Sequence, residues 1–177
     1  MRARPQSRSP ARAERDHAGR PAVATTDRLR RATYLQPGQL VAAPEPLEIS
    51  TVLGSCVAVC LWDRRRGQGG ANHFLLPQHG GAQASPRYGD VAVARLVSAL
   101  LGLGSRRDDL VAKLFGGANV ITAFRGEREQ LGARNVAVAR HVLAQERVPV
   151  VAEDVGGQRG RKLIFHTDDG LVRVRLI

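Results

Sequence analysis

Short apolar segments, separated by glycine or proline, fill the chain between residues 39 and 76. They read QLVAA, PLEIS, CVAVCLW and ANHFLL, and they cover residues 39–43, 46–50, 56–62 and 71–76. Short apolar or alternating runs between turn residues are typical of β-strands. We therefore predict four strands here and a first half that is rich in β-structure.

Two later segments have the period of a helix. The first begins near Gly89, where Asp90 stands in position to cap it, and glycines 102 and 104 follow its end. Its apolar stripe is formed by Val91, Ala94, Leu96, Val97, Leu100 and Leu101. The second helical segment covers about residues 135–146. Spacings of three and four residues predict amphipathic helices at both places.

The remaining segments resemble strands again. LVAKLFGGANV breaks at Gly116 and Gly117, VPVVAEDV follows the second helix, and KLIFHT and LVRVRLI flank a DDG turn. The last pair predicts a β-hairpin. Strands that frame two helices, without an internal repeat, predict a mixed α/β domain.

Composition and charge set limits on this domain. A chain of 177 residues with 43% hydrophobic residues is long enough for one core. Of the net charge of +11, residues 1–40 carry +6, because they hold nine arginines against Glu14, Asp16 and Asp27. We predict a disordered Arg-rich tail over residues 1–35, most simply a solvated extension, and a folded domain over residues 36–177.

The two cysteines do not form a disulfide framework, because i,i+4 spacing along a strand separates them too widely. No apolar run reaches the roughly 18 residues that span a bilayer. We expect a soluble protein in the cytoplasm.

Cys56, Cys60, His73 and His79 match the C-x3-C-x12-H-x5-H spacing of a zinc finger. Glycines 67, 69 and 70 lie where such a finger would begin its helix, and Pro77 interrupts the path between the histidines. The sequence therefore disfavours zinc, and we expect no metal and no organic cofactor. A zinc-dependent nucleic-acid-binding module remains the alternative of a different class.

The same residues also allow covalent chemistry. Cys56 follows the turn residues Gly54 and Ser55, and His73 lies on a neighbouring apolar strand. An imidazole within reach of a thiol can take its proton and activate it as a nucleophile. From the residues alone, two buried core residues explain the pattern equally well.

Longer motifs favour catalysis. TVLGSCVAVCLWD, GGANHFLLP, RYGD, KLFGGANV, GARN and VPVVAEDVGGQRGRKLIFHTDDG occur in this order. Together they resemble the CheD family of bacterial chemoreceptor glutamine deamidases, from about Gly38 to the end of the chain. The resemblance implies a layered α/β sheet sandwich with two main helices, similar to the toxin-type glutamine deamidases. It also implies hydrolysis of selected receptor glutamines to glutamate.

The resemblance assigns the nucleophile to Cys56 and the base to His73. A third residue, expected six positions before the cysteine, falls on Ser50, with Thr51 beside it. Either hydroxyl could orient His73, although adjacent residues of a strand point to opposite faces. We favour Ser50. The implied partners are the cytoplasmic domains of methyl-accepting chemotaxis receptors and the phosphatase CheC. An idle scaffold that binds receptors or CheC is a further alternative.

Overall fold

A computed structural model describes residues 30–81, 83–119 and 129–177. The elements follow one another as β1 (Arg31–Tyr34), β2 (Gln39–Ala43), β3 (Leu47–Leu53), β4 (Val57–Asp63), β5 (Gln68–His73), α1 (Gly89–Gly102), a 3-10 turn (Arg107–Asp109), β6 (Leu110–Gly116), α2 (Glu129–Gln145), β7 (Val150–Val155), β8 (Arg161–His166) and β9 (Val172–Leu176). Among the described residues, no helix combines the length and apolarity needed to cross a membrane.

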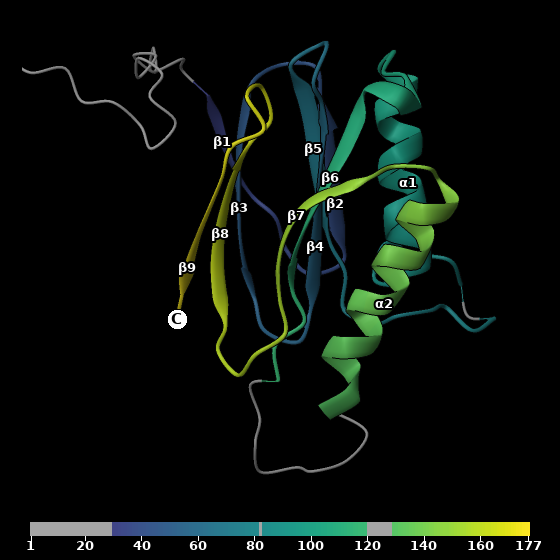
Figure 1. Cartoon of the computed structure of the whole chain (residues 1–177), viewed down its shortest axis with the longest axis vertical. Helices are drawn as coiled ribbons and strands as arrows, with labels where there is room; N and C mark the ends of the chain where they lie inside the picture. The colour runs from purple at the N-terminus through teal and green to yellow at the C-terminus, as the bar shows by residue number, and fades with distance from the viewer. Residues whose placement is uncertain (1–29, 82, 120–128) are drawn as a thin grey trace, which may run out of the picture.

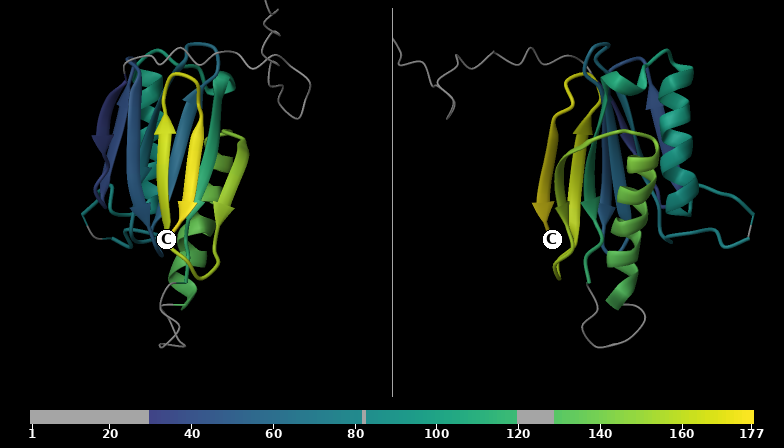
Figure 2. Two further views of the ribbon diagram at one scale, coloured as in Figure 1. Left: turned by 90° about the vertical axis from the view of Figure 1, so that its left-hand side faces the viewer. Right: turned by 45° about the vertical axis from the view of Figure 1, so that its right-hand side comes forward.

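The strands form two sheets that pack face to face. One sheet has the order β1-β3-β8-β9 and the other the order β2-β5-β4-β6-β7. Both helices cover the outer face of the five-stranded sheet, while none of the described residues form a helix on the outer face of the four-stranded sheet (Figures 1 and 2). The predicted mixed α/β sandwich with two main helices is confirmed. Its similarity to the toxin-type deamidases stays a prediction.

Strand β4 lies at the centre of this sandwich, with buried side chains on both faces. Val57, Val59 and Leu61 pack into the core under the helices. Ala58 and Cys60 pack into the second core, between the two sheets. This double burial explains the nearly continuous apolar run CVAVCLW, which a strand with one solvated face would not need.

The helices begin differently from the prediction. The cap of α1 is Tyr88, and Asp90 lies in the first turn, where its carboxylate contacts the His79 ring at 2.8 Å. Asp90 therefore does not occupy the predicted N-cap position, although its carboxylate accepts the backbone N–H of Val91 in the first turn at 2.9 Å. Helix α2 begins at Glu129, six residues before the predicted start, although Gly132 lowers helix propensity there. Gly132 is buried against the backbone of Gly117, and this packing compensates for the weak propensity.

The N-terminal edge of the domain also lies earlier than predicted. Residues 31–34, which we expected in the tail, form β1 and pair in parallel with β3. Leu35 follows with only 2% of its surface exposed. A four-residue strand has no period of its own to reveal it, since its stability depends on the neighbouring strand. Residues 1–29 lie outside the described residues, so the predicted tail stays a prediction there.

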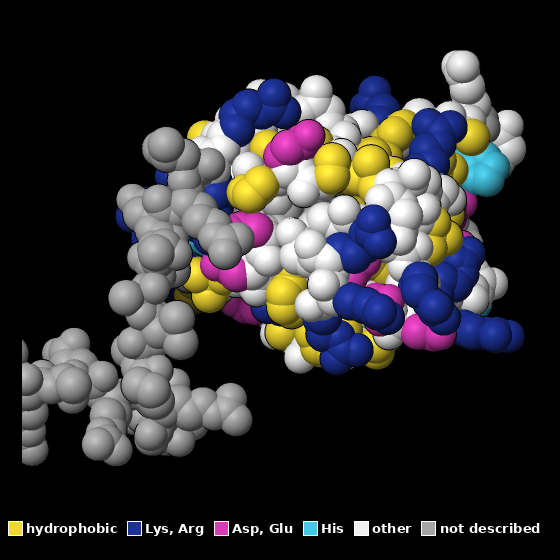
Figure 3. Space-filling view, turned by 90° about the horizontal axis from the view of Figure 1, so that it is seen from above, with side chains coloured by type: hydrophobic (Ala, Val, Ile, Leu, Met, Phe, Trp, Pro, Cys, Tyr) yellow, Lys and Arg dark blue, Asp and Glu magenta, His cyan; other side chains and the backbone are white. Residues whose placement is uncertain are grey.

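Charged side chains are distributed over the surface. On the face seen in Figure 3, lysines and arginines are interspersed with carboxylates and hydrophobic side chains. The edge strand β9 exposes Arg173 and Arg175, and Arg175 pairs in register with the exposed Lys162 of β8. Arg31 is exposed on β1, at the opposite edge of the same sheet.

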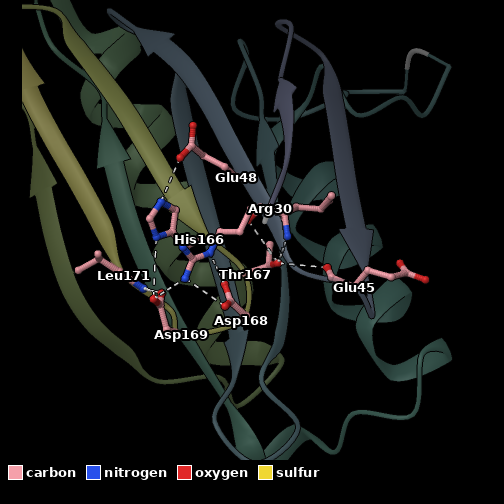
Figure 4. A network of polar contacts seen from close by, with 9 residues as sticks. Arg30, Glu45, Glu48, His166, Thr167, Asp168, Asp169 and Leu171 are labelled. Atoms are coloured by element: carbon pink, nitrogen blue, oxygen red, sulfur yellow. Dashed lines mark hydrogen bonds and ion pairs between the residues drawn. The ribbon is translucent and has the colours of Figure 1, made fainter. Parts of the chain in front are cut away.

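A polar network ties the start of the described chain to the β8–β9 hairpin (Figure 4). The Arg30 guanidinium donates to both carboxylate oxygens of Asp168, at 2.7 and 3.0 Å, and to Asp169 at 2.9 Å. The Arg30 and Asp168 side chains are only 9% and 6% exposed. Burial is the largest single effect on Asp168 and raises the pKa of this carboxyl. The hydrogen bonds from Arg30, the backbone hydrogen bond of Asp168 itself and the charges of Arg30 and His166 together outweigh it and hold the pKa below its usual value.

Replacing Arg30 should therefore weaken the fold in a pH-dependent way. We expect Arg30→Met to lower the free energy of unfolding at pH 7 by about 1–3 kcal/mol. A depressed pKa stabilises the folded state above the unfolded pKa and loses that effect as pH falls through the folded pKa. The difference between the urea titrations of the wild type and the variant should therefore begin to shrink below about pH 4, near the unfolded pKa, and disappear only below the lower folded pKa. Arg31→Met, at an exposed neighbour, is the matched control, and a pH-independent difference for Arg30→Met would exclude Asp168 as the relevant partner.

Candidate active site

Cys56 and His73 lie near each other at one end of the sandwich. Residues 54–56 connect β3 of one sheet to β4 of the other, so Cys56 stands where the chain passes between the sheets. His73 ends β5, which runs antiparallel to β4, and the next residue, Phe74, bridges to Val57. The strand pairing therefore brings the start of β4 and the end of β5 together.

Both side chains face the space between the sheets. Alternation along β4 gives Cys56 the direction of Ala58 and Cys60, and Cys56 packs against the inter-sheet core. Alternation along β5 gives His73 the direction of Ala71, another residue of that core. In this register His73 stands opposite Ala58, which makes Cys56 its diagonal neighbour on the same face.

A buried hydrogen bond joins His73 to the other sheet. The Thr51 hydroxyl oxygen lies 2.8 Å from Nδ1 of His73 and 2.8 Å from the Leu35 carbonyl oxygen. A hydroxyl has one proton, and the carbonyl can only accept it, so Thr51 donates to Leu35 and accepts from His73. We therefore assign the neutral imidazole proton to Nδ1. This leaves Nε2 as a proton acceptor.

Thr51, not Ser50, occupies the position beside the histidine. Thr51 shares the inward face of β3 with Leu47, Ile49 and Leu53, and it is 1% exposed. Ser50 points to the opposite face, where it pairs in register with Tyr34 and Ile164. The predicted placement of Ser50 against His73 is wrong, because the expected offset from the cysteine selected the outward-facing residue of the pair.

Burial keeps both reactive groups neutral at rest. It raises the pKa of the Cys56 thiol, and the backbone N–H of Cys56 opposes this effect only in part. It also lowers the pKa of His73, against a smaller opposite effect of the Leu35 backbone. Within the described residues, Nε2 of His73 is buried and has no hydrogen-bond partner. The site thus holds a thiol and an unprotonated imidazole, with Cys56 partly exposed.

The zinc-finger spacing does not correspond to a cluster in space. Cys60 is fully buried between the sheets, and burial raises the pKa of its thiol. His79 lies in the loop after β5, where it pairs with Asp90. Among the described residues, no three His, Cys, Asp or Glu side chains gather in a way that could hold a metal ion.

The glycine pair at which the LVAKLFGGANV run breaks supports the turn that carries Cys56. Gly116 and Gly117 have φ of 105° and 66°, and the N–H of Gly117 donates to the Cys56 carbonyl oxygen at 2.8 Å. A Cβ on Gly116 would overlap that same oxygen. Ala118 donates to the Gly54 carbonyl. The FGGAN motif was the signal for this support, since paired glycines mark close backbone approaches.

The fold and the site define an α/β sandwich with a partly exposed thiol beside a buried, oriented imidazole, an arrangement suited to acyl transfer. The family model described as CheD chemotactic sensory transduction matches residues 75–176. The chain belongs to the CheD family.

Curated relatives match over most of the chain. A probable chemoreceptor glutamine deamidase CheD 1 of Anaeromyxobacter dehalogenans is 57% identical over 146 residues, which are 82% of this chain and 85% of that protein. Its counterpart in Trichlorobacter lovleyi is 48% identical, over 80% of this chain and 88% of its own length. The Bacillus licheniformis hypothetical protein YfiH aligns with a TM-score of 0.41 and 16% identity, over 64% of this chain and 49% of that chain.

The neutral resting state predicts that the Cys56 thiol loses its proton only at a pH above the ordinary thiol pKa. Because its pKa is raised, the rate of alkylation by iodoacetamide should still increase with pH beyond the ordinary thiol pKa. Peptide mass analysis should find the label on Cys56 and not on buried Cys60, and Cys56→Ser should abolish it. A rate that already reaches a plateau at neutral pH would instead indicate a preformed thiolate–imidazolium pair.

Proposed function

We propose that this chain is a protein-glutamine glutaminase that converts glutamine side chains of chemotaxis receptors to glutamate. The observation that carries the proposal is the oriented imidazole: Thr51 holds Nδ1–H, and among the described residues the buried Nε2 has no hydrogen-bond partner, so it can accept a proton. The names of its curated relatives supply the substrate class. The reacting residues are Cys56 as nucleophile, His73 as base and Thr51 as the group that orients the base.

In the first half of the reaction, Nε2 of His73 takes the thiol proton as Cys56 attacks the carboxamide carbon. The carbonyl oxygen becomes an oxyanion, and the backbone N–H groups of the turn at residues 54–56 are the candidate donors for it. When the tetrahedral intermediate collapses, the His73 imidazolium gives its proton to the leaving nitrogen. Ammonia departs, and a thioester joins the former glutamine to Cys56.

In the second half, His73 acts again as a base. It takes a proton from a water molecule that attacks the thioester, and it returns a proton to the departing Cys56 sulfur. The products are a glutamate side chain and the free thiol. The low pKa of His73 suits this cycle, because an imidazole that is unprotonated at rest accepts a proton at each attack.

The substrate class implies where the enzyme works. Receptor glutamines that tune chemotaxis signalling lie in the cytoplasmic domain, so we propose a cytoplasmic enzyme with that domain as its partner. The phosphatase CheC is proposed as a second partner on the family resemblance alone. Neither reaction half needs a metal or an organic cofactor.

Deamidation can be measured directly. Incubation with a purified receptor cytoplasmic domain should convert specific glutamines to glutamates, seen by peptide mass analysis as a gain of about 1 Da, and Cys56→Ala should abolish it. Conversion that persists in Cys56→Ala would refute the assignment of the nucleophile. No conversion by the intact protein, together with receptor binding, would favour an idle scaffold.

The two neighbouring hydroxyls provide a sharp comparison. Thr51→Val keeps the shape of the side chain but removes the acceptor for Nδ1–H, so we expect kcat to fall by about 10- to 100-fold. Ser50→Ala, one residue away, should leave kcat within about twofold, because this half-buried side chain points to the opposite face of β3, away from His73. The reverse order of effects would show that Ser50 orients the base.

A further inference from the structure

Asn135 of α2 connects the two segments that carry the proposed reacting residues. Its side-chain nitrogen donates to the Ser55 carbonyl oxygen at 3.0 Å and to the Leu75 carbonyl oxygen at 2.9 Å. Ser55 directly precedes Cys56, and Leu75 follows His73 by two residues. One amide group on the helix therefore holds the backbone on both sides of the site.

The chemistry of these contacts requires an amide. Both partners are carbonyl oxygens, which only accept, so the NH2 group must face them, and its two protons serve the two bonds. Asn135 is completely buried, and within the described part of the chain its own oxygen has no partner. A buried acceptor without a partner is unfavourable. The hydrogen bonds that this side chain contributes are therefore the two that its nitrogen donates.

The packing of α2 against the sheet positions the amide group of Asn135. Gly132, one turn before Asn135 on the same helix face, lies so close to Gly117 that a Cβ would overlap the Gly117 carbonyl. Gly117 in turn donates to the Cys56 carbonyl. Two successive turns of the helix therefore contact the segment around Cys56, one through Gly132 and the other through Asn135.

The pairing of β4 with β5 does not fix the distance between Cys56 and the segment after His73, so α2 can set it. The last contact between β4 and β5 at this end is the bridge from Val57 to Phe74. Cys56 and Leu75 lie just beyond it, where the ladder no longer fixes the two chains relative to each other. We infer that Asn135 is a positioning residue that holds the Cys56 thiol in line with Nε2 of His73. The inference rests on the proposed function, because it concerns the same reacting pair.

The experiment compares Asn135→Leu with a matched buried amide elsewhere. Gln68, at the far end of β5, donates its NH2 group to the Ser105 hydroxyl at 2.8 Å and to the Leu103 carbonyl at 3.4 Å. Asn135→Leu and Gln68→Met each remove such a pair of bonds at similar side-chain volume. The measurements are the thermal midpoint, the pH profile of Cys56 alkylation by iodoacetamide, and kcat and KM for deamidation of the receptor domain.

We expect both variants to lose stability but only one to lose reactivity. Asn135→Leu should change the pH dependence of Cys56 alkylation in the same direction as His73→Gln, because both variants leave the thiol without an aligned base. It should also lower kcat by about 10- to 100-fold with little change in KM, since small misplacements of reacting groups have effects of this size. Gln68→Met should match the wild type in its alkylation profile and in kcat. If folded Asn135→Leu keeps the wild-type profile and kcat, Asn135 is only a structural anchor. Should it fail to fold, Asn135→Ala, which leaves room for water beside the two carbonyls, carries the same comparison and the same two outcomes.

The alkylation profile separates this inference from the proposed function. It needs no receptor, so a shifted profile in Asn135→Leu supports the positioning role even if the wild type deamidates nothing. Conversely, wild-type deamidation with an unchanged kcat in the folded variant upholds the proposed function and overturns the role of Asn135.

Discussion

The hydrogen bond between Thr51 and His73 is the constraint on which the site depends, because it joins the two sheets at the end where the chain passes between them. Facing sheets pack about 10 Å apart, and side chains of both must fill that space. Elsewhere between these sheets the filling is mainly apolar. At this end a threonine and a histidine meet instead, and their hydrogen bond satisfies buried polar atoms of both side chains. Any relative shift of the sheets would break a buried bond as well as a packing contact.

The same burial shapes the chemistry. A charged thiolate–imidazolium pair would be costly in this environment, so the resting pair is neutral. In the reaction that we propose, the proton moves only when a carboxamide arrives. Such a site discriminates through geometry, since the thiol reacts only with a carbonyl held close to it. The partial exposure of Cys56 provides that access, while only 2% of the His73 surface is exposed.

The fold was largely predictable because its strands and helices have clear periods, and the long ordered motifs added the family. Three features escaped for physical reasons. Strand β1 is stable only beside β3, and α2 extends over Gly132 because of a tertiary contact. Asp90 lies in the first turn of its helix, where it contacts His79, while Tyr88 holds the cap position. In the site, Cys56 and His73 could be named from the sequence. The choice between Ser50 and Thr51 depended on the phase of a single strand, which a one-residue error inverts.

The exposed arginines at the edges of the four-stranded sheet have a consequence for the behaviour of many copies in solution. An unpaired strand edge is a template on which another chain can add a strand, and this is a common route to fibrils. Here β9 presents Arg173 and Arg175, and β1 presents Arg31, so two copies that approach edge to edge bring like charges together. This repulsion acts over roughly 8 Å at physiological ionic strength. These exposed basic residues therefore disfavour edge-to-edge aggregation of the folded domain.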